Sequence, residues 1–334
     1  NTALGYQALT AFTTGTNNVA VGAEAGDNIT TGAGHVFIGY QAGDAVTTSQ
    51  NSVAIGTGAL RDGSGGTNSI AIGVFAGLVN TVESLFIGAS SGFYNTSGAG
   101  NVAVGSKAGW GNNTGASNTY IGFESGEGVA NNANSNNTGL GYRSLTAIST
   151  GAGNVTVGYR AGSAITSGGT NVHIGQDAGM TMTQNNGTIL IGAYAGDAIN
   201  STDANYTVAI GQEAGTAITS GRYQTLLGYR AGVSITEGDG NTLIGYESGQ
   251  ALTTGLDNTA VGMWSLNSNQ TGQRSVAIGS SALGSNVASG WTYNTAVGWA
   301  AGGNNTVGTS VTFIGARAGY NATGSYNTFV GSDA

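Results

Sequence analysis

The stretch from Asn51 to Gly56 reads NSVAIG, and close variants of it recur from one end of the chain to the other. Each variant ends in a glycine that directly follows Val, Ile or Leu. These anchor glycines run from Gly5 to Gly331, and most intervals repeat the spacing between Gly22 and Gly39, which is 17 residues. A fixed short period along a whole chain is typical of a solenoid, in which each repeat forms one coil stacked on its neighbours.

The composition favours stacked β-structure. The 334 residues include 62 glycines and no proline. Because proline cannot donate to a strand ladder, its absence suits a solenoid in which every coil is paired. Helices are not expected, since glycine recurs every few residues and the apolar period is two.

The remaining composition excludes several classes of function. Charged residues make up 7% of the chain and the net charge is -8, which does not fit a protein whose main partner is nucleic acid. There is no cysteine, so disulfides, thiolate chemistry and zinc thiolate sites are absent. No apolar run approaches the roughly 18 residues of a membrane-spanning helix, and the sequence does not start with a charged-then-apolar pattern, so we expect no signal peptide. We therefore expect no membrane insertion.

Each coil is expected to contain a short strand directly before its anchor glycine. The residue before the glycine is aliphatic, and the residue two places earlier is Thr, Val, Ile or Leu. Period two places both on one face of a strand, and we expect that face to be the interior. The predicted roll core contains Val21, Ile38, Ile55, Ile72, Ile121, Val157, Ile174, Ile191, Ile244 and Val261.

The residue between these two is expected to point outward, yet it too is mostly apolar. A nearly continuous apolar line exceeds what a soluble monomer normally exposes, so we expect identical rolls to associate side by side, most simply as a homotrimer. The alternative is that the alanines of this line are tolerated at the surface. The predicted trimer interface contains Ala20, Phe37, Ala54, Ala71, Phe86, Ala103, Tyr120, Leu190, Leu226, Leu243, Phe313 and Phe329.

A second, weaker strand is expected about seven residues after each anchor. Its apolar column contains Phe12, Ile29, Val46, Ile148, Ile165, Met182, Ile199, Ile218, Ile235 and Leu252. Where the column reads Asn, between about Arg61 and Asn113 and again after Asn267, we expect looser loops. Together these features predict an all-β fold, a parallel β-roll or β-solenoid of about twenty 17-residue coils.

Polar residues also form columns. The Asn that opens many motifs, such as Asn18 or Asn118, tolerates left-handed φ and can bond its neighbours in a ladder. Eleven charged residues lie two places after an anchor and predict a solvated edge of mixed sign: Glu24, Lys107, Glu124, Arg143, Arg160, Asp177, Glu213, Arg230, Glu247, Arg317 and Asp333. Nothing in this pattern builds a pocket that separates two carboxyl pKa values. We therefore predict no enzyme, no catalytic residue and no cofactor.

The two histidines offer the one candidate metal position. His35 occupies a turn position, whereas His173 lies in the predicted outward line. In a trimer, three copies of His173 could meet near the axis and hold a metal or an anion. A hydrogen-bonded interface histidine is the simpler interpretation, and we predict no metal.

Aromatic and threonine residues suggest two further surfaces. Aromatic residues directly after anchors, such as Tyr142 and Tyr159, predict broken ladders along one edge that either stack on cell-surface sugars or line the turn. Thr-Thr pairs such as Thr13-Thr14 raise ice binding as a rival function. Adjacent threonines in a strand face opposite sides, which weakens that rival.

The repeats resemble those of two families. NSVAIG, with NSIAIG at Asn68 to Gly73 and RSVAIG at Arg274 to Gly279, resembles the head repeat of trimeric autotransporter adhesins of the Yersinia adhesin type. NTALGYQAL at the start of the chain and GYQAG at Gly39 to Gly43 look even more like the repeats of bacteriophage tail fibres. The resemblance covers the whole chain and implies a left-handed parallel β-roll, three chains packed side by side, and attachment to host surfaces.

These observations lead to one expected function. We interpret residues 1–334 as a single repeat array, uncapped at both ends, that continues into a longer fibre. We expect the shaft of a phage tail fibre, located on the virion, that presents a receptor-binding tip; a bacterial trimeric adhesin head on the cell surface is the alternative, and an ice-binding solenoid the third. Expected partners are two further copies of the chain, the rest of the fibre, and a cell-surface glycan or protein receptor.

Overall fold

The computed structural model describes residues 1–64, 66–200 and 203–334. Within these ranges the chain is an all-β parallel solenoid of about 19 coils, without helices, as predicted. The coils form two compact units, Asn1–Gly169 and Thr170–Ala334. The handedness of the coil, the trimer and the single uninterrupted array stay predictions.

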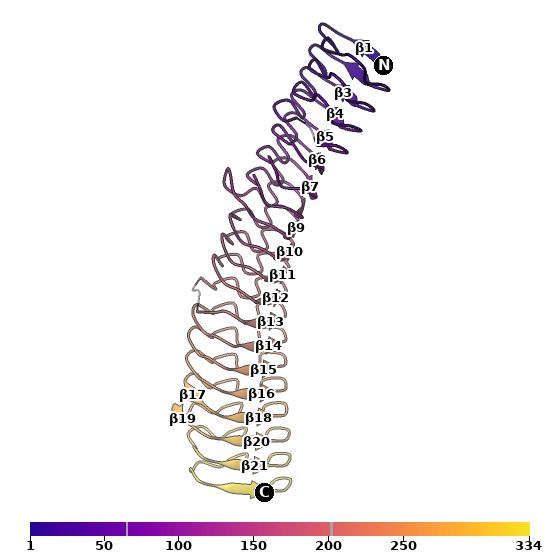
Figure 1. Cartoon of the computed structure of the whole chain (residues 1–334). Coiled ribbons are helices and arrows are strands. Elements are labelled where there is room, and N and C mark those ends of the chain that lie inside the picture. Colours follow the sequence, from indigo (N-terminus) through magenta and orange to yellow (C-terminus); the bar gives the residue numbers. More distant parts are fainter. Residues whose placement is uncertain (65, 201–202) are drawn as a thin grey trace. The chain divides into compact units, whose positions relative to one another are not determined.

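In the first unit, each strand pairs in parallel with the next along the chain (Figure 1). Every strand lies where the motif predicts it, directly before an anchor glycine. The strands are β1 (Thr2–Leu4), β2 (Val19–Val21), β3 (Val36–Ile38), β4 (Val53–Ile55), β5 (Ile70–Ile72), β6 (Ser84–Ile87), β7 (Asn101–Val104), β8 (Thr119–Ile121), β9 (Thr138–Leu140) and β10 (Val155–Val157).

The second unit continues the same pattern and adds a short side ladder. Its main strands are β11 (Val172–Ile174), β12 (Ile189–Ile191), β13 (Val208–Ile210), β14 (Thr225–Leu227), β15 (Thr242–Ile244), β16 (Thr259–Val261), β18 (Val276–Ile278), β20 (Thr295–Val297), β21 (Thr312–Ile314) and β22 (Thr328–Val330). Each pairs in parallel with the next main strand. In the side ladder, β17 (Gly272–Gln273) pairs with β19 (Gly290–Trp291).

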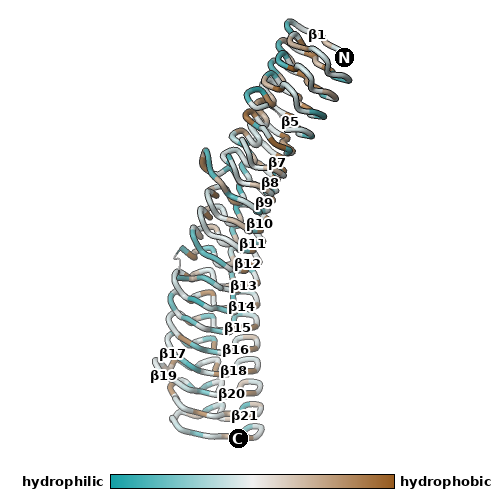
Figure 2. Tube along the Cα trace, viewed as in Figure 1, coloured by the Kyte–Doolittle hydropathy of each residue, from teal (hydrophilic) through white to brown (hydrophobic). Residues whose placement is uncertain are grey.

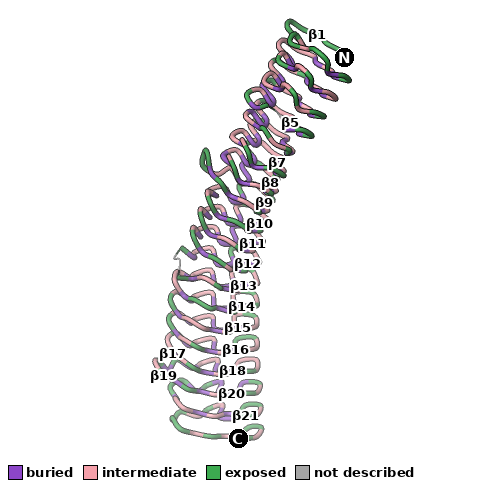
Figure 3. The backbone as a smooth tube through the Cα atoms, viewed as in Figure 1, coloured by how far each residue is buried: buried purple, intermediate pink, exposed green. Residues whose placement is uncertain are grey.

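The structure reverses the predicted facing of the strands. In every main strand except the terminal β1 and β22, the residue two places before the anchor glycine is buried inside its own coil, and the residues on either side of it face outward. Buried and more exposed segments therefore alternate along these coils (Figure 3). Of the twelve residues predicted at the trimer interface, eleven are at most 2% exposed in the single chain, and only Phe329, in the last coil, is half-buried. Those eleven side chains therefore cannot contact another chain, and their assignment to an interface was wrong.

The predicted roll core is likewise wrong. Val21, Ile38 and the other eight residues of that set are half-buried or exposed, and Ile38 is 39% exposed. An apolar period of two shows that alternate residues of a strand share a face, but it does not say which face is inside. A shift of one residue exchanges the inward-facing and the outward-facing residues.

The interior is filled by side chains of complementary size. A large residue in the middle of a strand is accommodated by a glycine four places after the anchor: a Cβ on Gly126 would lie 2.4 Å from the Tyr120 ring. Where leucine replaces that glycine, as at Leu60 and Leu145, the strand's middle residue is small, Ala54 and Gly139 respectively. In coils of these two kinds one large side chain fills the space, which keeps the packing dense. Other coils, such as that of Ala20 and Gly26, have a small residue at both positions.

In the described parts of the chain the predicted second strand is not formed, although its column is in the core. Ile29, Val46 and most of the other aliphatic residues of this column are fully buried. The backbone N–H of Ile29 donates to the carbonyl of Gly26 at 3.2 Å, within its own coil, and Val46 bonds Gly43 in the same way. Because these donors close local turns, they are not available for a ladder between coils. The column is therefore a row of turns.

Buried asparagines form the predicted ladder. The Asn101 side-chain oxygen accepts the backbone N–H of Asn118 at 2.9 Å, and the Asn118 side-chain amide donates to the carbonyl of Asn134 at 2.8 Å. Each such side chain therefore satisfies a backbone donor and a backbone acceptor of the next coil, which would otherwise be buried unpaired. The left-handed residue is the one before the ladder asparagine, such as Asn17 or Ser117, and not the ladder residue itself.

The expected looser loops are also absent where asparagine replaces the aliphatic column. Asn80 and Asn95 are at most 1% exposed, and the Asn95 amide donates to the Asn80 side-chain oxygen at 2.8 Å. In the second unit Asn269 donates to Asn286 at 3.1 Å in the same manner. The prediction failed because an internal hydrogen-bonded row can take the place of an apolar row at little cost.

Candidate interaction surface

The outward face of the main strands is an extended row of apolar residues and threonines. It consists of the residue directly before each anchor glycine, the third column, and the residue two places earlier, the first column. We call these two rows the outer columns. The third column is Val, Ile or Leu in every main strand, and the first column is Thr, Val, Ile or Leu in all. Exposed members include Leu227 (45%), Ile314 (43%) and Leu140 (42%). No main strand places a charged residue in either column.

Hydrophobic and hydrophilic segments alternate along the coils (Figure 2). Parallel pairing keeps the columns in strict register, as in Val208 beside Thr225 and Ile210 beside Leu227. Half-exposed β-branched residues on a pleated surface with no charge among them are unusual for a face open to water, where charged side chains normally dominate. The outer columns are therefore the strongest candidate for an interaction surface.

A charged edge borders this face, as the sequence predicts. Glu124 lies between Lys107 and Arg143, at 3.6 Å and 2.6 Å. Arg230 lies between Glu213 and Glu247, at 3.4 Å from each. Opposite charges in successive coils therefore pair along the edge. Partly exposed pairs such as those of Arg230 contribute little to stability, about 0–1 kcal/mol each. Glu124 and Asp177 are buried and depart from the predicted solvated edge.

The aromatic ladder is present as well, but its rings stack on one another. Phe123 and Tyr142 are 5.6 Å apart between ring centroids, and Tyr142 and Tyr159 are 5.3 Å apart, with nearly parallel planes. The guanidinium of Arg143 lies over Tyr142, at 5.6 Å from the centroid. The ring faces in the middle of this stack are already covered, which favours the turn-lining interpretation over sugar binding here.

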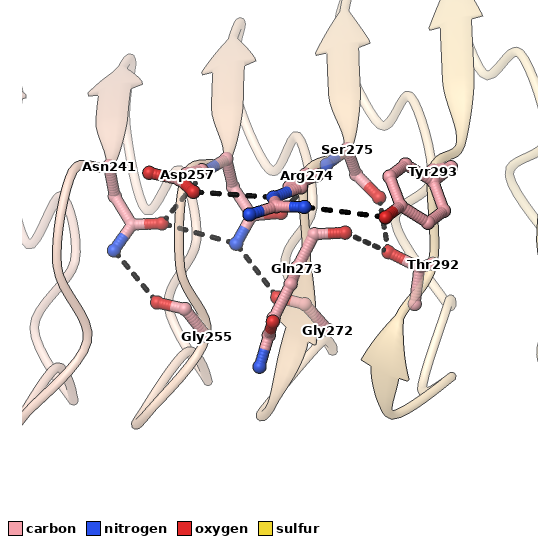
Figure 4. A network of polar contacts seen from close by, with 10 residues as sticks. Asn241, Gly255, Asp257, Gly272, Gln273, Arg274, Ser275, Thr292 and Tyr293 are labelled. Atoms are coloured by element: carbon pink, nitrogen blue, oxygen red, sulfur yellow. Dashed lines mark hydrogen bonds and ion pairs between the residues drawn. The ribbon is translucent and has the colours of Figure 1, made fainter.

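A polar network joins successive coils near the side ladder (Figure 4). Arg274 bonds Asp257 at 3.4 Å and the Tyr293 hydroxyl at 3.3 Å, and its guanidinium lies 4.1 Å from the centre of the Trp291 ring. Beneath it, the Asn241 amide donates to the carbonyl of Gly255 at 2.9 Å. The partners in this network belong to neighbouring coils, so its contacts join the coils to one another.

The histidines are interior residues. His35 is buried, with Nε2 donating to the Ser49 carbonyl at 2.9 Å and Nδ1 accepting the Ser52 N–H at 3.2 Å. It is a ladder residue in place of asparagine, and burial lowers its pKa. His173 is also fully buried and contacts the Thr188 hydroxyl at 2.9 Å, and burial lowers its pKa to about 3. A side chain enclosed by its own coil cannot meet other copies at an axis, so the axial site at His173 is ruled out.

The described ranges contain no group of three or more His, Asp or Glu side chains that could hold a metal ion. Nor do these ranges include a helix with the length and apolar character needed to cross a membrane. A scan against protein-family models and a search of curated proteins find no match for this chain. Inferences about function therefore rest on the fold and its surfaces.

Proposed function

We propose that this chain is the shaft segment of a homotrimeric extracellular fibre whose outer columns face one another. One observation carries the proposal: the outer columns are apolar or threonine throughout both units, without a charge. A surface of this kind is stabilised by transfer out of water at about 25 cal/mol per Å² of apolar area buried. Three-fold association of identical faces would cover it and leave the charged edge in solvent.

The most specific form of the proposal is the tail fibre of a bacteriophage, which the resemblance of NTALGYQAL supports. The function is then mechanical: the shaft holds a receptor-binding tip away from the virion. Backbone hydrogen bonds between coils continue outside the strands, as from Gly26 to Ala42 at 2.9 Å, and such continuous pairing suits a part that must resist unfolding. A bacterial trimeric adhesin head is the alternative with the same assembly.

The experiment is the solution mass of the chain by light scattering, without any fused trimerisation domain. A mass of three chains supports the fibre. A folded monomer at all concentrations contradicts it. Adsorption assays then separate the two settings, because an adhesin head binds host cells firmly by itself whereas a shaft lacking its tip makes only weak contacts.

One observation favours ice binding as a second candidate. In the second unit the first outer column reads Thr225, Thr242 and Thr259 in three consecutive, in-register strands. This outward row differs from the Thr-Thr pairs considered from the sequence, and it lies beside a second row of Leu227, Ile244 and Val261. Val276 interrupts it. Thermal hysteresis of a monomeric sample would establish this function, and its absence would exclude it.

A further inference from the structure

A groove of about 460 Å³ opens on the second unit, in the turns that follow β16, β18, β20 and β21. The sequence explains its position. Five places after the anchor, most coils carry a larger side chain, such as Arg61, Trp110 or Met180. Two consecutive coils have glycine there instead, Gly284 and Gly303. The groove is the space that those missing side chains leave.

The backbone does not require glycine at these two positions. Unlike the anchors, neither has a left-handed φ, and a Cβ on Gly284 would meet its nearest neighbour, the Ser281 carbonyl oxygen, at 3.1 Å. At Gly303 the nearest atom is in the Tyr320 ring, at 2.8 Å, so this ring closes over the glycine. The groove therefore arises because side chains are missing at these two positions, and not because the backbone of the turn requires glycine.

Two tryptophans form the walls of the groove. Trp264 is 42% exposed and its indole N–H donates to Glu247 at 3.0 Å, which fixes the ring. Trp299 is 59% exposed, and none of the described rings stacks on it. Unlike the stacked tyrosines of the charged edge, Trp299 therefore offers a free ring face. Exposed aromatic walls around a pocket of this volume are typical of small-molecule sites.

Apart from one arginine, the polar groups of the groove are neutral. Amides of Asn267 and Asn304 and hydroxyls such as that of Ser281 line it. The one charged lining residue is Arg317, which lies 3.4 Å from Asp333 and 5.0 Å from the centre of the Tyr320 ring. Its charge is therefore balanced locally, and no carboxylate lines the groove.

We propose that this groove binds a short neutral oligosaccharide. Sugar rings present apolar C–H faces that stack on indole, and their hydroxyls both donate to and accept from amides and hydroxyls. The site would let the shaft make lateral contacts with glycan, independently of any tip. It does not rest on the proposed trimer, since all of its residues come from one unit of one chain.

The test uses the full chain with three neutral probes, maltotriose, cellotriose and the trimer of N-acetylglucosamine, and one acidic probe, sialyllactose. Binding is followed by saturation-transfer NMR and by tryptophan fluorescence. We expect at least one neutral trisaccharide to bind with millimolar affinity or better. Failure of all three to bind overturns the proposal, and binding of sialyllactose alone overturns the assignment to a neutral sugar.

Three variants locate the site. Trp299→Ala removes a wall, and Gly284→Thr refills the groove with the residue that other coils carry, as at Thr146 and Thr216. Each should weaken binding at least tenfold. Trp291→Ala is the matched control, because Trp291 is also 59% exposed but lies outside the groove. Unchanged binding in both groove variants contradicts the proposal, and circular dichroism confirms that each variant is folded. The solution mass of the chain, measured separately, reports whether it forms the proposed trimer.

Discussion

At the scale of single residues, the anchor glycine is the position with the least freedom. Gly279 has a φ of +130°, and a Cβ there would lie 2.3 Å from the carbonyl oxygen of Gly298 in the next coil. Two separate constraints therefore act on it, the backbone conformation and the close approach of two coils.

These constraints can be separated by substitution. Gly279→Ala should destabilise the chain by several kcal/mol, on the order of 2–4, because strain at φ and a backbone clash add together. Gly290→Ala is the control, since Gly290 has a φ of +71° but a Cβ added there would have no atom within 4 Å. It should cost only about 1 kcal/mol. Equal losses in urea unfolding would show that crowding between coils is not the dominant constraint.

Buried His173 makes the stability of the folded chain depend on pH in a predictable direction. Its pKa falls from 6.5 to about 3 in the folded chain because burial disfavours the charged ring. The unfolded chain therefore binds a proton between these values while the folded chain does not. The stability associated with neutral His173 is present above pH 6.5 and is lost as the pH falls toward 3, by up to about 1.4 kcal/mol per pH unit. Buried His35 acts in the same direction.

The variant His173→Leu should remove this contribution. Leucine occupies the same strand position at Leu190 and Leu226, each with a glycine four places after its anchor. Unfolding free energies of the two proteins, measured from pH 7 to pH 4, should diverge below pH 6.5 in favour of the variant. Carboxylates titrate equally in both proteins and cancel in the difference. Parallel curves would contradict the assignment of a neutral buried histidine.

At the scale of the coil, the sequence predicts the position of every main strand but not its facing. Uniform Val, Ile and Leu columns look like a core, whereas the true core column ranges from Gly139 to Tyr120. That variation is the signal of packing, because an interior position must match its neighbours in size. Leu145 opposite Gly139, and Leu266 opposite Ala260, could have identified the inner face from the sequence alone.

Of the candidate surfaces, too, the sequence predicts one but not the other. The charged edge follows directly from a column of mixed sign, and the structure confirms it. The groove could not be predicted as a cavity, since its walls come from side chains in several coils. Its one sequence signal is the consecutive Gly284 and Gly303 in a column that elsewhere carries larger residues.

Size complementarity within a coil can be measured by a double-mutant cycle. Leu243→Ala alone should cost about 2–5 kcal/mol because it leaves a cavity. Gly249→Leu alone should also be destabilising, since even a Cβ at Gly249 would lie 2.6 Å from Leu243. The double variant recreates the arrangement of Ala260 with Leu266, where leucine adopts the same left-handed φ. It should be more stable than the sum of the two losses predicts, by at least about 1 kcal/mol. Additive losses would mean that the two positions do not share one space.

At the scale of the whole molecule, the single chain already closes its core. It exposes 12355 Å² of surface, close to the roughly 12,500 Å² expected for a folded monomer of its mass. Association is therefore not needed to complete the interior. The proposed trimer rests instead on the composition of the outer columns. A substitution there should therefore change the assembly without changing the stability of the single chain.

Charges placed on the outer columns should break the assembly and leave the fold intact. Leu227→Lys together with Ile278→Lys alters two third-column residues that are 45% and 40% exposed, so each chain should fold with an almost unchanged melting temperature. In a trimer these ammonium groups would be buried without partners, at a cost of several kcal/mol per site. We expect the solution mass to fall from three chains to one. Met263→Lys is the control, because Met263 is 42% exposed but lies outside the columns. A trimer that survives the double substitution, or that the control also disrupts, would place the contact on another face of the coil.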